Sequence, residues 1–405
     1  MKAYERFLKY AVIPTMSDEA SESIPSTAKQ LVLAEKVKEE LLSLSLSDAR
    51  VDEYGYVYAT LPATAGCEDI TPIGFIAHLD TSCEASDENI KPVITEYQGG
   101  DILMNEEKGI YLTVKDYPNI SDYVGHRIIT SDGTTLIGAD DKAGIAEIIT
   151  AIEKIINTGA PHGKICIAFT PDEEIGRGAD QFDVEAFGAE YAYTVDGGAL
   201  GEIEYENFNA ASAKVKVNGI SIHPGSAKGK MKNASLIATE FNSLLPSEEI
   251  PEKTEGYEGF HHLLSMKGEC EAAYLNYIIR DHDMTLFEKK KEDFIKAAKT
   301  INEKYGEGTL LLDLTDSYFN MKEKIEPCMY IVERAREAMR EEGIIPVTVP
   351  IRGGTDGAKL SFMGLPCPNL CTGGENFHSR FEFVSCEVME KIADIIARIA
   401  TNLAK

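Results

Sequence analysis

Apolar positions in the first half of the chain form short continuous segments separated by longer segments with helical spacing. "PIGFIAHLD" (72–80), "KICIAF" (164–169) and "YAYTV" (191–195) predict buried strands. Between the first two, a helix is predicted over about 142–157, and Gly159 and Pro161 end it. Its apolar face would contain Ile145, Ile148, Ile149, Ile152, Ile155 and Ile156. This alternation predicts an α/β fold, with a mainly parallel sheet and helices on both faces.

The pattern changes near residue 207. "SAKVKV" (212–217) alternates as a half-exposed strand, and a helix over about 233–245 follows. Strands near 262–266 and 271–280, a second amphipathic helix, and the strand "TLLLDLTD" (309–316) complete the order β-α-β-β-α-β. That order is the ferredoxin-like arrangement. We therefore expect a main domain of residues 1–206 and 319–405, interrupted by a ferredoxin-like α+β domain of residues 207–318. A final helix over 388–403 would complete the main domain.

Composition narrows the class of protein. A hydrophobic content of 43% and a charged content of 26% are typical of a globular protein, and no segment has the apolar length of a membrane helix or a secretory signal. The net charge of −27 argues against nucleic acid as a partner. Eight cysteines without paired CxxC units favour a reducing compartment. We expect a cytoplasmic protein with no membrane or nucleic-acid partner.

Acidic residues and a histidine gather where the predicted strands end. The segments are "HLDTS", "GADDKAG", "PDEEIG" and "TVDGG", and they supply His78, Asp80, Asp140, Asp141, Glu173, Glu174 and Asp196. Taken singly, each has an ordinary explanation, such as a helix N-cap or a solvated turn. Ligand sites in parallel sheets form beyond the carboxyl ends of the strands, so we expect these groups to meet there. So many carboxylates require cations, and histidine with carboxylate suits zinc, cobalt or manganese better than calcium.

Motifs along nearly the whole chain resemble those of one enzyme family. They are "HLDTS", "GADDKAG", "TPDEEIG", "TVDGG", "HPGSAKG", "PIRGGTDGAKLSFMGLPCPNL" and "TGGENFH". The set is similar to the peptidase T family of tripeptide aminopeptidases, a branch of the zinc exopeptidases that include aminoacylases and glutamate carboxypeptidases. "NFNAAS", "EGYEGFHHLLSMKG" and "YIIRD" point to the tripeptidase branch.

The resemblance implies a metal centre of two zinc ions per chain, with cobalt or manganese as substitutes. Asp140 would bridge the ions across a cis peptide to Asp141. The remaining protein ligands would be His78 and Asp196 for one ion, and Glu174 and His378 for the other. Asp80 would share a face with His78, two residues earlier on a strand, and accept the second imidazole N–H. Glu173 would stay off the metals and act as general base and then acid.

Substrate contacts and assembly are implied in the same way. Arg352 would bind the substrate carboxylate and His223 the oxyanion, with Asn207 and Arg280 as further candidates. The inserted domain would serve as a lid and as a possible homodimer contact. The leading hypothesis is a dinuclear zinc aminopeptidase acting on tripeptides. Alternatives are a dipeptidase or N-acyl-amino-acid deacylase of the same family, or a metal- or peptide-binding protein without turnover.

Overall fold

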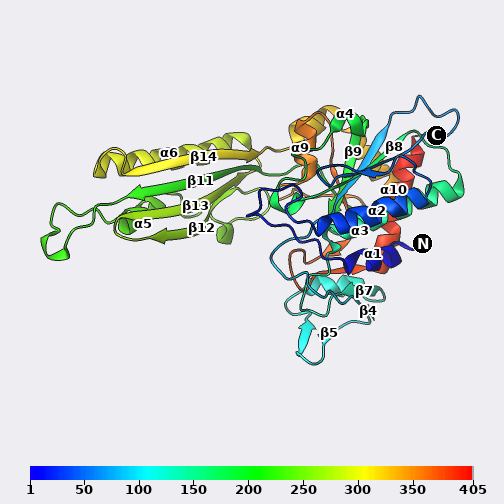
Figure 1. Ribbon diagram of the computed structural model, residues 1–405, viewed down its shortest axis with the longest axis horizontal. Helices are drawn as coiled ribbons and strands as arrows, with labels where there is room; N and C mark the ends of the chain where they lie inside the picture. The colour runs from blue at the N-terminus through cyan, green and yellow to red at the C-terminus, as the bar shows by residue number, and fades with distance from the viewer. Residues whose placement is uncertain (404–405) are drawn as a thin grey trace. The chain divides into compact units, whose positions relative to one another are not determined.

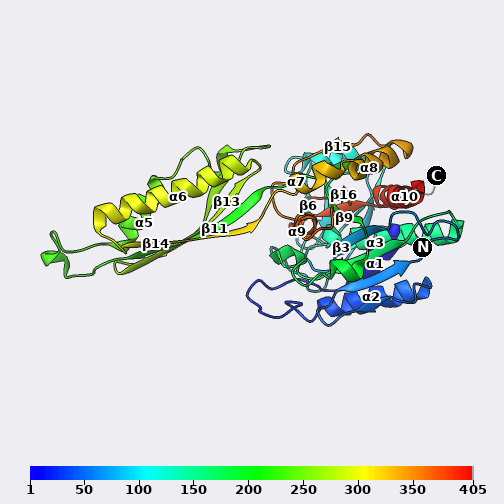
Figure 2. The same cartoon turned by 90° about the horizontal axis from the view of Figure 1, so that it is seen from above.

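A computed structural model describes residues 1–403, and the chain divides into two compact units. The first unit contains Met1–Tyr205, Met321–Val349 and the chain from Thr355 onward. The second contains Glu206–Asn320 and Pro350–Gly354. Figures 1 and 2 show the elements of each unit from two directions. Within the described residues, no helix combines the length and the apolar character needed to cross a membrane.

The first unit is built on an eight-stranded mixed sheet. Its strands, in spatial order, are β1 (Arg50–Val51), β2 (Val57–Leu61), β8 (Ile165–Thr170), β3 (Ile73–His78), β9 (Tyr191–Gly197), β16 (Asn369–Cys371), β10 (Glu202–Glu204) and β15 (Val347–Thr348). The four central strands, from β8 to β16, are parallel to one another. β2 and β10 pair antiparallel with the edges of that group. The predicted α/β sheet is confirmed, with its parallel pairing concentrated in the middle.

Helices cover both faces of this sheet, as predicted. On one face α3 (Ala139–Thr158) packs on β3 and β9, and α1 (Ala3–Ala11) and α10 (Cys386–Asn402) pack on α3. On the other face, α4 (Val184–Phe187) and α9 (Asp356–Phe362) share an apolar cluster with the strand residues Ile76 and Ala168. The unit also contains α2 (Gln30–Ser43), α7 (Lys322–Ile325) and α8 (Tyr330–Glu341).

One detail of the predicted helix differs from expectation. The sequence predicts a single apolar face that includes Ile156, but Ile156 is exposed, while residues 141–152 are buried on every side of the helix. The reason is that α1 and α10 cover the side of α3 that faces away from the sheet. A helix enclosed in this way no longer shows the polar face of a surface helix.

A smaller antiparallel sheet belongs to the same unit. Its order is β17 (Gly374–Glu375), β18 (Phe383–Ser385), β7 (Arg127–Thr130) and β4 (Val93–Glu96). A hairpin of β5 (Ile102–Asn105) and β6 (Ile110–Leu112) precedes β7 in the chain. The connection between β17 and β18 carries His378, so this sheet supports part of the site described below.

The second unit has the predicted β-α-β-β-α-β order. Its elements are β11 (Asn209–Asn218), α5 (Ala234–Ser243), β12 (Phe260–Gly268), β13 (Ala272–Asp281), α6 (Met284–Tyr305) and β14 (Leu310–Tyr318). The sheet is antiparallel with the order β12-β13-β11-β14, and α5 and α6 cover one face of it (Figures 1 and 2). Phe241, Phe294 and Ile301 from the helices pack against Val215 and Tyr277 from the strands. This is the ferredoxin-like fold.

The segment Pro350–Gly354 belongs to the second unit, although the sequence-based boundaries place it in the main domain. Ile351 forms a parallel bridge with Asn207, and the Ile351 N–H donates to the Glu206 carbonyl at 2.8 Å. Gly354 packs so closely on the Tyr318 ring that a Cβ at this position would lie 2.7 Å from it. These contacts are made by single residues of a loop, so they cannot be predicted from the local periodicity of the sequence.

Candidate active site

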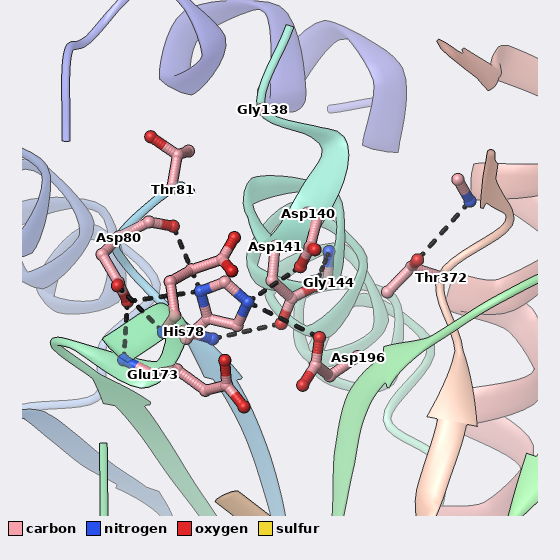
Figure 3. Close-up of polar contacts among 12 residues, drawn as sticks. His78, Asp80, Thr81, Gly138, Asp140, Asp141, Gly144, Glu173, Asp196 and Thr372 are labelled. Atoms are coloured by element: carbon pink, nitrogen blue, oxygen red, sulfur yellow. Dashed lines mark hydrogen bonds and ion pairs between the residues drawn. The ribbon is translucent and has the colours of Figure 1, made fainter. Parts of the chain in front are cut away.

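Polar side chains meet at the carboxyl ends of the parallel strands. His78 is the last residue of β3, Asp196 lies near the end of β9, and Glu173 and Glu174 follow β8 directly. Asp140 enters from the first turn of α3 (Figure 3). The sheet topology therefore brings together the acidic segments that the sequence places at separate strand ends.

One group of possible ligand atoms surrounds His78, which is only 2% exposed. The His78 Nε2 atom lies 2.8 Å from Asp140 Oδ1 and 3.5 Å from Asp196 Oδ1. Asp141 could also complete a group with His78 and Asp196, because its ligand atoms fall within 4.8 Å of theirs. However, the Asp141 oxygens accept the backbone N–H groups of His78 at 3.1 Å and Gly144 at 3.2 Å. Asp140 is therefore the better candidate ligand.

A second group forms around the other oxygen of Asp140. The His378 Nε2 atom lies 3.3 Å from Asp140 Oδ2 and 2.9 Å from Glu174 Oε2. The other ring nitrogen, His378 Nδ1, lies 3.1 Å from Glu84 Oε2. Asp140 thus has one oxygen directed to each group, which is the geometry that a bridging carboxylate needs. The peptide between Asp140 and Asp141 is cis, as the resemblance implies.

Asp80 holds the turn that carries the two glutamates. Its carboxylate accepts the Glu173 N–H at 2.9 Å on one oxygen and the Glu174 N–H at 3.1 Å on the other. The His78 Nδ1 atom lies 3.1 Å from the Asp80 backbone carbonyl and 3.4 Å from its Oδ1. The imidazole thus forms its hydrogen bond with the Asp80 carbonyl, while the Asp80 carboxylate binds the backbone of the glutamate turn.

The electrostatics of the cluster fit a site for cations. Burial, reinforced by the charge of Asp196, raises the pKa of Glu173 well above its ordinary value, and burial raises that of Glu174 to about 7. Hydrogen bonds to Asp140 and Glu174 raise the pKa of His378 to about 11. Protons are thus retained where positive charge is needed. Glu174 Oε1 is buried with no hydrogen-bond partner among residues 1–403, which suits a metal ligand. The residues present therefore fit a pair of divalent cations.

The four predicted substrate-binding residues lie in the second unit and contact it. The Arg352 guanidinium donates to the carbonyls of Gly256 at 2.5 Å and Glu258 at 3.1 Å, and it stacks on the rings of Phe208 and Phe260. Buried Asn207 donates to the carbonyls of Phe208 and Phe319, and Arg280 donates to those of Ala211 and Ile279. His223 is exposed and caps a short 3-10 turn by accepting the Gly225 N–H.

Three further acids that sequence reasoning missed contact these segments. Glu84 approaches His378 as described, and Asp172 accepts hydrogen bonds from the Ser26 backbone N–H at 2.6 Å and the Gln30 side chain at 2.6 Å. Glu382 accepts the N–H groups of Gly138 and Asp140. The place of Asp172 in the acidic turn is the one sequence signal for its presence near the site. Nothing in the sequence indicates which groups these three acids bind.

Comparisons with known proteins agree with this arrangement. Residues 205–306 match the family described as the peptidase dimerisation domain. The chain is 56% identical over 406 residues to a peptidase T of Caldanaerobacter subterraneus subsp. tengcongensis, covering 100% of this chain and 99% of that protein. A solved tripeptidase from Staphylococcus aureus has the same fold (TM-score 0.80, 22% identity, 100% of this chain and 98% of that chain). So does a dinuclear metal-binding M20 peptidase from Bacillus subtilis (TM-score 0.67, 14% identity, 99% and 97%).

Proposed function

The chain belongs to the peptidase T family and is a peptidase, and we propose that it removes the N-terminal residue from tripeptides by metal-assisted hydrolysis. The observation that carries the proposal is the pair Glu173–Glu174. The Asp80 carboxylate fixes the backbone of both residues, yet only Glu174 joins His378 and Asp140. This difference supports Glu174 as a metal ligand and Glu173 as the residue that transfers protons.

The residues that would hold two divalent cations form two sets that share Asp140. His78 and Asp196 complete the first set, and Glu174 and His378 complete the second. When bound, such a pair of cations lowers the pKa of a water molecule and polarises a carbonyl group. Histidine and carboxylate donors favour zinc, with cobalt or manganese as substitutes. The B. subtilis peptidase with the same fold is described as a dinuclear metal-binding peptidase, which supports two ions rather than one.

Glu173 performs the proton transfers. Its side chain lies near His78 and Asp196 (Figure 3), inside the cluster but outside both ligand sets. Its carboxylate lacks the contact that joins Glu174 to His378, so it is available to accept a proton and then release it. Glu173 takes the proton of the attacking water as the C–O bond forms. It then delivers that proton to the leaving amine as the peptide C–N bond breaks.

We assign the terminal carboxylate of the peptide to Arg352, as the family resemblance implies. The planar guanidinium of Arg352 is shaped to bind a carboxylate through two parallel hydrogen bonds. In the structure two backbone carbonyls and two aromatic rings fix its orientation. A terminal carboxylate would replace the carbonyl oxygens of Gly256 and Glu258. His223 would stabilise the oxyanion, and Asn207 and Arg280 are further candidates for substrate contacts.

The proposal extends to assembly and location. The match of residues 205–306 to a peptidase dimerisation domain supports a homodimer formed through the second unit, which would also act as a lid. The proposed catalytic domain is residues 1–206 and 319–405 and the proposed lid and dimerisation domain is 207–318, with Pro350–Gly354 grouped with the second as described above. All eight cysteines are free, which supports a reducing cytoplasm.

The variant Glu173→Gln tests the assignment of the base. It is expected to bind two Zn²⁺ or Co²⁺ ions per chain like the parent and to lose about 10²- to 10⁴-fold in kcat for a tripeptide. The matched variant Glu174→Gln is expected to lose metal as well as activity, because it removes a ligand. Parental turnover by Glu173→Gln would show that the base is another group.

A substrate panel tests the reaction itself. Hydrolysis of Ala-Ala-Ala is compared with that of Ala-Ala, N-acetylated peptides and N-acetyl amino acids, before and after chelation and zinc readdition. We expect cleavage of the free tripeptide from its N-terminus, lost on chelation and restored by zinc. Cleavage of N-acetyl amino acids alone would instead indicate the deacylase reaction.

A further inference from the structure

Glu382 is a buried acid that the proposed mechanism does not use. It is only 1% exposed and lies directly before β18, at the end of the loop that carries His378. Neither its position in the sequence nor a motif identifies it as part of the site. Taking a carboxylate out of water requires compensating contacts, so its partners indicate what it does.

Both oxygens of this carboxylate bind the start of α3. Glu382 Oε2 accepts the Gly138 N–H at 2.9 Å, and Oε1 accepts the Asp140 N–H at 2.9 Å. Asp140 and Asp141 have non-helical backbone angles, so these N–H groups lie before the regular part of α3 and have no intrahelical acceptor. A serine or asparagine cap would satisfy one such donor, whereas the carboxylate satisfies two and fixes the backbone on both sides of Ala139.

The same residue closes the loop that carries His378. The Glu382 N–H donates to the Ser379 carbonyl at 3.0 Å, and the Asn376 side chain donates to the Phe381 carbonyl at 3.1 Å. The next residue, Phe383, is buried and pairs with Thr130 in the small sheet. The loop therefore has a fixed base, and Glu382 is the point at which this base meets α3.

Two candidate ligands thus depend on one carboxylate. The Asp140 backbone is bound by Glu382, and the His378 loop ends at Glu382, while the Asp140 and His378 side chains lie 3.3 Å apart. Asp140 and His378 lie in chain segments that are far apart in sequence. A shift at Glu382 would change the separation of the two side chains that a cation must bridge.

We propose that Glu382 is a positioning residue that joins the His378 loop to the start of α3 and so sets the distance between His378 and Asp140. This inference rests on the proposed function only in taking those two residues as ligands of one cation. It predicts an effect on metal affinity and on the Asp140 backbone, and either can be measured without peptide hydrolysis.

The test uses Glu382→Gln in the full chain. Glutamine keeps one acceptor but directs an NH₂ group at the other backbone N–H, so one bond is lost and two donors face each other. We expect Co²⁺ affinity, measured by visible absorption in competition with a chelator, to fall about 10- to 100-fold. Hydrogen exchange of residues 136–141 is expected to accelerate in the metal-free protein.

The matched control is Glu387→Gln. The Glu387 carboxylate also accepts a backbone N–H, that of Arg127 at 2.8 Å, but it lies in the first turn of α10. Its loss is expected to lower stability without changing Co²⁺ affinity or exchange at 136–141. Should Glu382→Gln fail to fold, Glu382→Asp keeps the charge and is expected to show the same two effects, smaller in size. Parental Co²⁺ affinity in a folded Glu382 variant, or an equal loss in the control, would overturn the proposal. If the unmodified protein binds Co²⁺ but does not cleave tripeptides, the proposed function is wrong while the proposal for Glu382 stands.

Discussion

A buried glutamate in α3 gives a sharp prediction about stability. The Glu147 side chain is 0% exposed, and neither of its oxygens has a hydrogen-bond partner among residues 1–403. Burial, and then the charge of Glu390, raises the pKa of the Glu147 carboxyl well above its ordinary value. We predict that Glu147→Met stabilises the protein at neutral pH, because methionine has a similar unbranched chain and no charge to bury.

The size of the effect follows from two terms. Removing an unsatisfied buried polar group contributes about 1–3 kcal/mol at any pH. The second term depends on pH: an unfolded glutamate ionises above a pKa of about 4.3, while the folded one keeps its proton. The folded state then binds more protons, so stability falls by about 1.4 kcal/mol per pH unit until the folded-state pKa is reached. The advantage of the variant should therefore grow as the pH rises from about 5 towards neutrality.

Denaturant unfolding of the metal-loaded protein at these two pH values measures the difference. Glu153→Gln on the same helix is the control with the opposite sign. Its carboxylate accepts from Arg6 and from the N-terminal amine, each at 2.8 Å, and despite partial burial these bonds lower its pKa. That contribution to stability is present above the unfolded pKa and disappears as the pH falls through the folded pKa. The control is therefore destabilised at both pH values.

The outcome that refutes the reasoning is specific. If the free-energy difference between Glu147→Met and the parent is the same at both pH values, Glu147 has the same protonation state folded and unfolded. Its raised pKa would then be wrong. A variant less stable than the parent at neutral pH would show that the carboxylate has binding partners that outweigh its desolvation.

Two predictions concern the site. Asp80→Ala removes both acceptors for the Glu173–Glu174 turn and is expected to lower metal affinity about 10- to 100-fold, measured by chelator competition. Asp52→Ala, which removes an acceptor of two backbone N–H groups from a surface turn, should leave affinity unchanged. Arg352→Lys keeps the charge but loses the planar fork, so KM for a tripeptide should rise about tenfold with kcat nearly constant. The preference for a tripeptide with a free C-terminal carboxylate over the same peptide with a C-terminal amide should fall too. Arg334→Lys, a stacking arginine of the first unit, is the control, and an equal KM effect there would contradict the assignment.

Sequence patterns predicted the elements well and placed acidic segments at the strand ends, because both are local signals. The strand ending at His78, the acids after β8 and the acid near the end of β9 follow from apolar segments and their neighbours. The contacts that fix the site were not predictable in the same way. The bonds from Glu382 to α3, and the return of Pro350–Gly354 to the second unit, join residues far apart in sequence. They are made by single polar groups, which leave no periodic pattern.

The position of β16 has a consequence for biosynthesis. This strand lies between β9 and β10, and it pairs parallel with β9 and antiparallel with β10. Both partners precede the second unit in the chain, whereas β16 (Asn369–Cys371) follows it. A nascent chain must therefore complete Glu206–Asn320, which can fold as it leaves the ribosome, before the large sheet can close. His378 follows β16 within a few residues. The last candidate ligand thus emerges together with the last central strand, so a chain that ends before His378 carries only part of the candidate metal site.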